Sequence, residues 1–275
     1  MRLRGKRFPW GERTFLMAIV NVTPDSFSGD GRSAADAAIE HALRQWRAGA
    51  DMLDIGGEST RPGHTPVDAR TEIARVVPVI EAVRAHEPEA IVSIDTYKPA
   101  VARAAHAAGA DIVNSVLGAP PDLLDTAAEL GMPLAAMHNQ RDTHYDGDVV
   151  DAVVAYLHEC AERAVARGIP RECVLLDPGI GFGKTADQNI RVLRHVDRIC
   201  ALGFPTLLGT SRKSTLGRLT QREPHERIYG TAATTALGIA AGIDVVRVHD
   251  VAANRDAIRV ADAIVRDWRP ERWTE

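Results

Sequence analysis

The sequence is poor in the features that mark secreted, membrane-bound or nucleic-acid-binding proteins. Its 3 cysteines, Cys160, Cys173 and Cys200, lack metal-ligand spacing and fall in expected helices or strands, so neither a disulfide framework nor a zinc site is predicted. No apolar run approaches membrane-spanning length, and no signal-peptide apolar segment follows the basic residues 2–7. A net charge of -4 disfavours nucleic-acid and membrane surfaces as partners. We therefore expect a cytoplasmic protein that acts on small molecules.

Linkers and lysines are also scarce. No stretch rich in proline, serine or glycine divides the 275 residues, which indicates one domain over residues 1–275. Lysine occurs only at positions 6, 98, 184 and 213, so nearly all positive charge comes from arginine. A lysine kept within a glycine-rich loop of such a chain suggests a need for a compact ammonium rather than a planar guanidinium.

Eight short, branched apolar runs recur along the chain, and each stops at a polar or glycine residue. They cover residues 15–22, 52–55, 90–94, 111–116, 133–137, 173–176, 205–208 and 244–248. Alanine-rich stretches with helical apolar spacing separate them, as at residues 34–46, 73–83, 149–165 and 252–265. Strands that alternate with helices form a parallel sheet, and eight such units predict a closed (β/α)8 barrel in a single α/β domain, from about residue 15 to about 266. The carboxyl ends of its strands would meet on one catalytic face.

The first two strand-end loops are rich in glycine, proline and hydroxyl side chains. Residues 21–31 read NVTPDSFSGDG, and Asn21 with the hydroxyls and carboxylates that follow could serve an anion or Mg²⁺. Residues 56–63 read GGESTRPG, in which Arg61 could fork onto phosphate oxygens. The alternatives are a helix cap for the first loop and a solvated side chain for Arg61. Loop length and the position at a strand end favour function.

Strands three, four and six finish with Asp95, Asn114 and Asp177. A carboxylate beside low-dielectric packing is costly unless it is hydrogen-bonded, so each either caps a helix or faces a ligand rich in donors. The loop DPGIGFGKT has neither the P-loop nor the dinucleotide-fingerprint spacing. We expect it to bring its backbone and Phe182 close to a flat ligand, with Lys184 partly solvated or capping locally.

The last two strands end in GTSRKS, residues 209–214, and RVHD, residues 247–250. Arg247 and His249 are two residues apart, so we expect them on the same side of a strand, as a paired cationic wall for phosphate oxygens. A helix is expected to begin at Ser214, beside a common phosphate-binding position in barrels. A strand-end histidine on its own would more often be an ordinary satisfied side chain.

Together and in this order, NVTPDSFS, DIGGESTRPG, SIDTYKP, MHN, DPGIGFGKT, LLGTSRKS, GTAATTALGI and RVHDV resemble the dihydropteroate synthase family of folate biosynthesis, over residues 19–251. The resemblance implies a transferase that joins 6-hydroxymethyl-7,8-dihydropterin pyrophosphate to 4-aminobenzoate by an SN1-like displacement. The products would be 7,8-dihydropteroate and pyrophosphate. It further implies Mg²⁺ as cofactor, inhibition by sulfonamides and a homodimer built by late helices.

The same resemblance assigns roles to strand-end residues. Asp95, Lys213, Arg247 and His249 would be catalytic. The pterin would be bound by Asp95, Asn114, Met137, Asp177, Gly209, Lys213 and Arg247; the pyrophosphate by Asn21, Thr60, Arg61, Arg247 and His249, with Asn21 also holding the metal; and the 4-aminobenzoate by Thr60, Pro62, Phe182, Lys213 and Ser214. Because the first two loops offer few apolar anchors, we expect them to become ordered on binding Mg²⁺ and an anion, so that 4-aminobenzoate binds last.

Two other functions stay open at the level of sequence. A pterin-dependent methyltransferase barrel would share the fold and the acidic pterin contacts. It needs no pyrophosphate wall, so Arg61, Arg247 and His249 count against it. A non-catalytic pterin-binding paralogue is not supported, because every residue assigned to catalysis is present.

Overall fold

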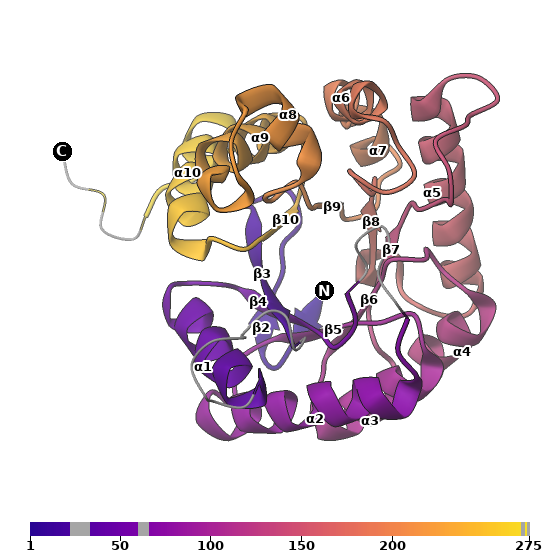
Figure 1. The fold of residues 1–275 in the computed structure, drawn as a ribbon, viewed down its shortest axis with the longest axis vertical. Helices are drawn as coiled ribbons and strands as arrows, with labels where there is room; N and C mark the ends of the chain where they lie inside the picture. Colours follow the sequence, from indigo (N-terminus) through magenta and orange to yellow (C-terminus); the bar gives the residue numbers. More distant parts are fainter. Residues whose placement is uncertain (23–33, 60–65, 271–272, 274–275) are drawn as a thin grey trace.

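The computed structural model describes residues 1–22, 34–59, 66–270 and 273, and eight of its strands form one parallel sheet. The strands pair in the order β8-β7-β6-β5-β4-β3-β10-β9, and a parallel bridge from Leu176 to Thr206 joins β8 to the segment before β9. The sheet is thereby closed, which confirms the predicted barrel (Figure 1). The strands are β3 (Phe15–Asn21), β4 (Met52–Gly56), β5 (Val92–Asp95), β6 (Ile112–Ser115), β7 (Leu134–Met137), β8 (Val174–Asp177), β9 (Leu207–Leu208) and β10 (Val245–Val248).

Helices surround the barrel on its outside (Figure 1). They are α1 (Ala34–Arg47), α2 (Ala69–His86), α3 (Pro99–Ala108), α4 (Pro121–Glu129), α5 (Val149–Ala166), α6 (Ala186–Arg194), α7 (Asp197–Cys200), α8 (Ser214–Thr220), α9 (Ile228–Ala240) and α10 (Val251–Val265). Their alanine-rich faces let them pack closely on the strands, as with Ala38 and Ala42 of α1, both fully buried. Within the described part of the chain, no helix has the length and apolar character needed to cross a membrane.

Side chains along each strand alternate between the barrel interior and the layer beneath the helices. On β4, Leu53 and Ile55 belong to the large apolar cluster under the helices, whereas Met52 belongs to a separate cluster inside the barrel. Ile91, directly before β5, belongs to this interior apolar cluster. Its members on the strands are Phe15, Met17, Met52, Ile112, Ala135, Leu175, Leu207 and Val245. Positions two residues further along each strand face the interior again, closer to the carboxyl ends.

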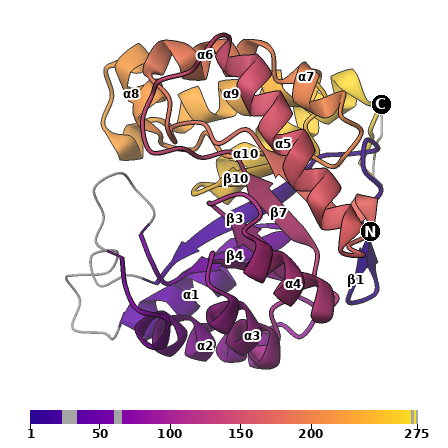
Figure 2. The same cartoon turned by 90° about the vertical axis from the view of Figure 1, so that its right-hand side faces the viewer.

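An antiparallel hairpin that the sequence did not predict precedes the barrel. It consists of β1 (Arg2–Leu3) and β2 (Lys6–Arg7), seen at the edge of the barrel in Figure 2. Leu3, Phe8 and Trp10 pack against the interior apolar cluster, and the Phe8 and Phe15 ring centroids are 4.9 Å apart. The interior apolar cluster therefore closes off the amino ends of the strands, which leaves the carboxyl ends as the face from which a ligand can reach the barrel axis.

Candidate active site

Polar side chains replace the interior apolar cluster toward the carboxyl ends of the strands. Met52 is followed two residues later by Asp54, and Val245 by Arg247, so strand alternation turns both toward the interior. Five strands each supply one such group, and the four uncharged or acidic ones are at most 7% exposed. The five are Asp54 on β4, Asp95 on β5, Asn114 on β6, Asp177 on β8 and Arg247 on β10.

Arg247 joins two of the carboxylates. Its Nε donates to Asp54 Oδ2 at 2.6 Å, and its Nη2 donates to Asp95 Oδ2 at 2.7 Å. Asn114 Nδ2 also donates to Asp54 Oδ2, at 2.9 Å. The other two oxygens, Asp54 Oδ1 and Asp95 Oδ1, are buried and have no hydrogen-bond partner within the described residues. A buried carboxylate oxygen without a donor is costly, so both oxygens indicate a ligand that brings N–H groups.

The ionisation of this cluster is shifted by its burial. Burial raises the pKa of Asp95 to about 7, although Arg247 opposes the shift, and the nearby charge of Asp54 raises it further. Burial likewise raises the pKa of Asp177, against the pull of Lys213. Burial alone would lower the pKa of Arg247, but the adjacent Asp54 and Asp95 carboxylates raise it, so this side chain stays charged. The site is therefore poised to change its charge near neutral pH.

Three of the predicted pterin-binding groups converge on Gly209. A Cβ atom placed on this glycine would lie 3.8 Å from Asp177 Oδ2, 3.8 Å from Lys213 Nζ and 3.9 Å from Arg247 Cβ. Asp177 Oδ1 accepts a hydrogen bond from the N–H of Gly179 at 2.7 Å, which fixes the carboxylate. The absence of a side chain at Gly209 thus leaves room for a ligand beside the Asp177 carboxylate and the Lys213 ammonium.

Lys213 and Phe182 lie together, as the sequence predicted. The Lys213 ammonium is 4.7 Å from the Phe182 ring centroid and donates to the carbonyl of Ile180. A Cβ on Gly181 would come within 3.2 Å of Lys213 Cδ, so glycine lets the loop approach the lysine stem. Burial lowers the pKa of Lys213 to about 8, while Asp177 acts in the opposite direction.

Lys184 is not solvated, and the prediction for this residue was wrong. It is only 8% exposed, and its Nζ donates to the carbonyls of Gly179 and Phe182, both at 3.0 Å. The third contact of Nζ is with Nδ1 of His138 at 2.8 Å, and burial together with Lys184 lowers the pKa of that imidazole to about 3. Thr185 rather than Lys184 caps α6. Lys184 therefore holds the glycine-rich loop in place, because two of the three acceptors of its ammonium are carbonyls of that loop.

Arg247 and His249 occupy different surroundings. Arg247 is directed into the barrel toward Asp54 and Asp95, whereas Nδ1 of His249 lies 3.0 Å from Ser211 Oγ in the loop after β9. The N–H of His249 also donates to Ser211 Oγ, at 3.1 Å. Of the two residues predicted to form a cationic wall, Arg247 is thus already paired with carboxylates. That Arg247 and His249 bind pyrophosphate together stays a prediction.

The remaining predicted residues divide between described and undescribed parts of the chain. Asn21 is the last residue of β3 and is half-buried, and Met137 is the buried last residue of β7. Ser214 is exposed and begins α8, as predicted. Thr60, Arg61 and Pro62, together with most of the first loop, lie outside the described residues. The order of substrate binding, which depends on those loops, stays a prediction.

Asp54 is the residue that sequence reasoning missed. It lies in the middle of the apolar run MLDIG and was read as part of a strand rather than as a strand end. Its signal was the alternation itself, because Asp54 shares the interior face with Met52 and with Gly56. A fully buried aspartate that holds both Arg247 and Asn114 organises the two neighbouring groups of the site.

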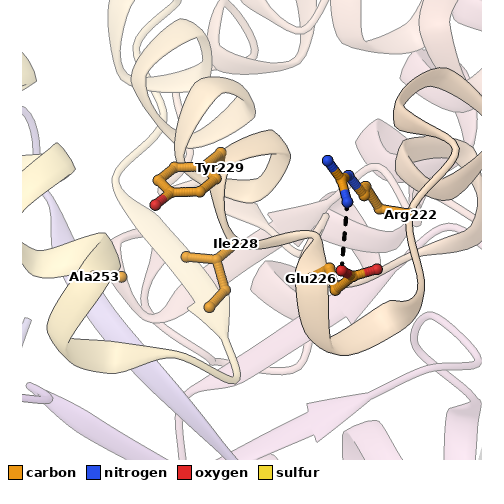
Figure 3. Close-up of a pocket in the computed structure, with 5 residues that line it drawn as sticks. All are labelled: Arg222, Glu226, Ile228, Tyr229 and Ala253. Atoms are coloured by element: carbon orange, nitrogen blue, oxygen red, sulfur yellow. Dashed lines mark hydrogen bonds and ion pairs between the residues drawn. The ribbon is translucent and has the colours of Figure 1, made fainter.

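A separate hollow of about 540 Å³ is lined by residues from η3 (Pro224–Glu226), the segment before it, α9 and α10 (Figure 3). Arg222 and Glu226 on its wall pair with each other at 3.5 Å, so neither offers an unengaged charge. The other walls are Ile228, Tyr229 and Ala253. Because no buried carboxylate or cation converges there, we place the active site at the barrel mouth instead.

Comparison with known proteins identifies the family of the chain. A family model described as pterin binding enzyme matches residues 17–249. A dihydropteroate synthase from Clostridium beijerinckii is 44% identical and covers 97% of this chain and 100% of its own length. Two solved dihydropteroate synthases share the fold. The enzyme from Clostridium difficile, solved in the presence of pteroic acid, is 45% identical with a TM-score of 0.91, and the match covers 94% of this chain and 100% of that chain. The enzyme from Xanthomonas albilineans, solved with 4-aminobenzoic acid, is 46% identical with a TM-score of 0.89, and the match covers 92% of this chain and 94% of that chain. The chain therefore belongs to the pterin-binding enzyme family and, within it, to the dihydropteroate synthases.

Proposed function

We propose that the barrel mouth joins 6-hydroxymethyl-7,8-dihydropterin pyrophosphate to 4-aminobenzoate, giving 7,8-dihydropteroate and pyrophosphate. The observation that carries the proposal is the convergence of three buried carboxylates on two cations, with Asp54 Oδ1 and Asp95 Oδ1 lacking a protein donor among the described residues. A dihydropterin has the ring N–H and amino donors that such acceptors require. The pyrophosphate of the substrate, in turn, requires cations at the rim.

The pterin edge fits the geometry around Gly209. Asp177 can accept from the adjacent amide N–H and amino group of the pterin, because its Oδ1 is already aligned by the N–H of Gly179. Lys213 Nζ, which would lie 3.8 Å from a Cβ placed on Gly209, can donate to the pterin carbonyl and ring nitrogen. Asn114 offers both a donor and an acceptor, and Met137 supplies an apolar wall at the end of β7.

The SN1-like step separates charge, and the site has a group for each charge. The carbon–oxygen bond to pyrophosphate breaks with its electron pair leaving on oxygen, so the pterin methylene becomes cationic. Asp95 can stabilise that cation, since its Oδ2 is held by Arg247. Arg247 and His249, with Thr60 and Arg61, would stabilise the leaving pyrophosphate. The neutral arylamine then attacks and releases a proton.

Mg²⁺ would bind at Asn21. The amide oxygen of this residue is a hard ligand at the carboxyl end of β3, in register with Gly56. A single protein oxygen leaves most of the octahedral shell to phosphate oxygens and water, which fits a metal brought to the site with pyrophosphate. When bound, the ion neutralises charge on the leaving group. The residues therefore suit Mg²⁺ as a substrate-linked ion.

The 4-aminobenzoate would lie against Phe182 and Lys213, whose ammonium is 4.7 Å from the Phe182 ring centroid. Thr60, Pro62 and Ser214 would complete this pocket. If the first two loops build it only after pyrophosphate has bound, titration calorimetry of 4-aminobenzoate should show much higher affinity with Mg²⁺, pyrophosphate and a pterin than without them. Equal affinity in both conditions would mean a preformed pocket. We expect sulfonamides to compete for the same position.

The proposed activity is tested by pyrophosphate release that requires both the pterin pyrophosphate and 4-aminobenzoate. Release with only one of the two substrates would contradict the proposal. A methyltransferase would form no dihydropteroate, and a silent paralogue would bind the pterin without releasing pyrophosphate. Chromatography of the product identifies dihydropteroate directly.

A homodimer is also proposed, built by the outer faces of the last helices. Tyr229 and Leu237 of α9 are 87% and 71% exposed, and Ile264 of α10 is 78% exposed. Figure 2 places α8, α9 and α10 together on one side of the barrel. Exposed large apolar side chains in one region are typical of an association surface. Light scattering at micromolar concentration should give twice the monomer mass, and Leu237→Asp should lower the measured mass.

We also propose a cytoplasmic location, which cell fractionation would test.

A further inference from the structure

One residue of the site has a backbone conformation that its side chain disfavours. Arg212 has φ of 59°, in the left-handed region, although it is not glycine. It stands between Ser211, which contacts His249, and Lys213, which borders Gly209. Strained backbone of this kind persists only where the surrounding structure fixes it, and it concentrates at functional sites.

The surroundings fix Arg212 from several directions. Its N–H donates to Thr231 Oγ1 at 3.3 Å, and its carbonyl accepts from Arg227 Nη1 at 2.8 Å. Its guanidinium forms a two-point ion pair with Asp250, with Nε to Oδ2 at 3.0 Å and Nη2 to Oδ1 at 2.5 Å. The planar fork matches the carboxylate, which a lysine could not do. Residue 212 is thus held through its backbone by the start of α9 and through its side chain by the start of α10.

A second contact lies next to this ion pair and joins the same two loops. Ser211 Oγ contacts His249, and the next residue in each loop, Arg212 and Asp250, forms the ion pair. In an extended chain neighbouring side chains point to opposite sides, yet both of these reach the loop after β10. The left-handed turn at Arg212 makes the two parallel contacts possible. We name the pairs Ser211–His249 and Arg212–Asp250 the double contact.

We propose that Arg212 is a positioning residue, which through the double contact holds His249 where it meets the leaving pyrophosphate. The inference rests on the role proposed above for His249. Arg212 itself touches Asp250 rather than substrate, so its influence on the reaction passes through the loop after β10.

Two variants of Arg212 separate the role of its guanidinium from that of its backbone, and a third variant elsewhere serves as the control. Arg212→Gln removes the charge, and Arg212→Gly removes the side chain while adopting the left-handed conformation without strain. We expect both to lower kcat/KM for the pterin pyrophosphate about tenfold. The affinity for 6-hydroxymethylpterin, which lacks pyrophosphate, should stay unchanged. Arg198→Gln breaks a comparable but exposed pair with Asp151, 2.7 Å apart on the outside of the barrel, and is the matched control with parent kinetics.

A double-mutant cycle gives the decisive result. In a His249→Ala background, Arg212→Gln should cause almost no further loss, because the group it positions is absent. Equal losses in both backgrounds, or parent-like kinetics of Arg212→Gly, would overturn the inference. If His249→Ala alone has parent kinetics, the proposed role of His249 fails instead, and the two failures are thus distinct. Should Arg212→Gln not fold, Asp250→Asn breaks the same ion pair, and the same comparison applies. Asp250 makes no side-chain cap bond to α10.

Discussion

At the amino ends of the strands, the carboxylates of buried Asp262 and half-buried Asp111 use both oxygens, whereas those of Asp54 and Asp95, toward the carboxyl ends, do not. Asp262 accepts from the N–H and the hydroxyl of Thr14, one on each oxygen, and Asp111 binds Arg4 through one oxygen and Arg84 through the other. Asp54 and Asp95 each keep one buried oxygen without a partner among the described residues. Complete pairing stabilises a fold, while an unfilled acceptor reserves a place for a ligand. The two ends therefore separate stability from recognition.

The largest effect is expected for substitution of Arg247, because this residue contributes both to stability and to recognition. Arg247→Ala leaves Asp54 and Asp95 buried without their cation, which should cost about 3–5 kcal/mol in the free energy of unfolding. Turnover should be lost as well. Urea denaturation measures the first effect and pyrophosphate release the second. A variant with the parent unfolding midpoint would show that the cluster does not depend on this arginine.

Asp177 should affect recognition alone. Asp177→Asn puts an amide donor where the pterin brings donors, and the mismatch should cost about 1–3 kcal/mol, or about ten- to hundredfold in Kd. The unfolding midpoint should not fall, since burial already disfavours the charged form of this carboxyl. Calorimetric titration with a pterin decides the matter. Parent-like affinity would remove Asp177 from the pterin site.

Asp262 should give the opposite result at the other end. Asp262→Asn weakens the contacts with Thr14 and should lower the free energy of unfolding by about 1–3 kcal/mol. KM and kcat should both match the parent, because Asp262 lies on α10 beneath the first barrel strand. Thermal unfolding and steady-state kinetics on the same preparation provide the comparison. A change in KM would mean that the two ends are coupled.

The smallest expected effect is a shift in pH dependence. The reaction needs Asp95 ionised and Lys213 protonated, so kcat/KM should fall below about pH 7 and above about pH 8. Asp54→Asn removes a like charge that raises the pKa of Asp95, and the acid limb should move to lower pH. An unmoved acid limb would assign it to another group. The basic limb serves as the internal control, since Asp54 is not among the causes of the Lys213 shift.

The sequence was informative where local patterns decide the outcome. The alternation of apolar runs and helical stretches predicted the barrel, and the strand-end positions of Asp95, Asn114 and Asp177 followed from it. Asp54 was not predicted as a site residue because it lies within an apolar run. Its role becomes visible only when strand alternation directs it into the interior of the closed barrel. Lys184 was misread for a related reason, since its three acceptors lie on two different loops. Left-handed backbone at Arg212 has no sequence signature comparable with glycine.

The N-terminal hairpin constrains the order in which the chain can fold during synthesis. Phe8 and Trp10 are made first, but their partners in the interior apolar cluster include Leu207 and Val245, which are made near the end. Strand β3 must likewise wait for β10 before the barrel closes, with Phe15 in register with Val245. Such distant contacts close slowly. Fluorescence of Trp10 should therefore report the last event of folding, and a nascent chain should keep these aromatic side chains exposed until the final strand has left the ribosome.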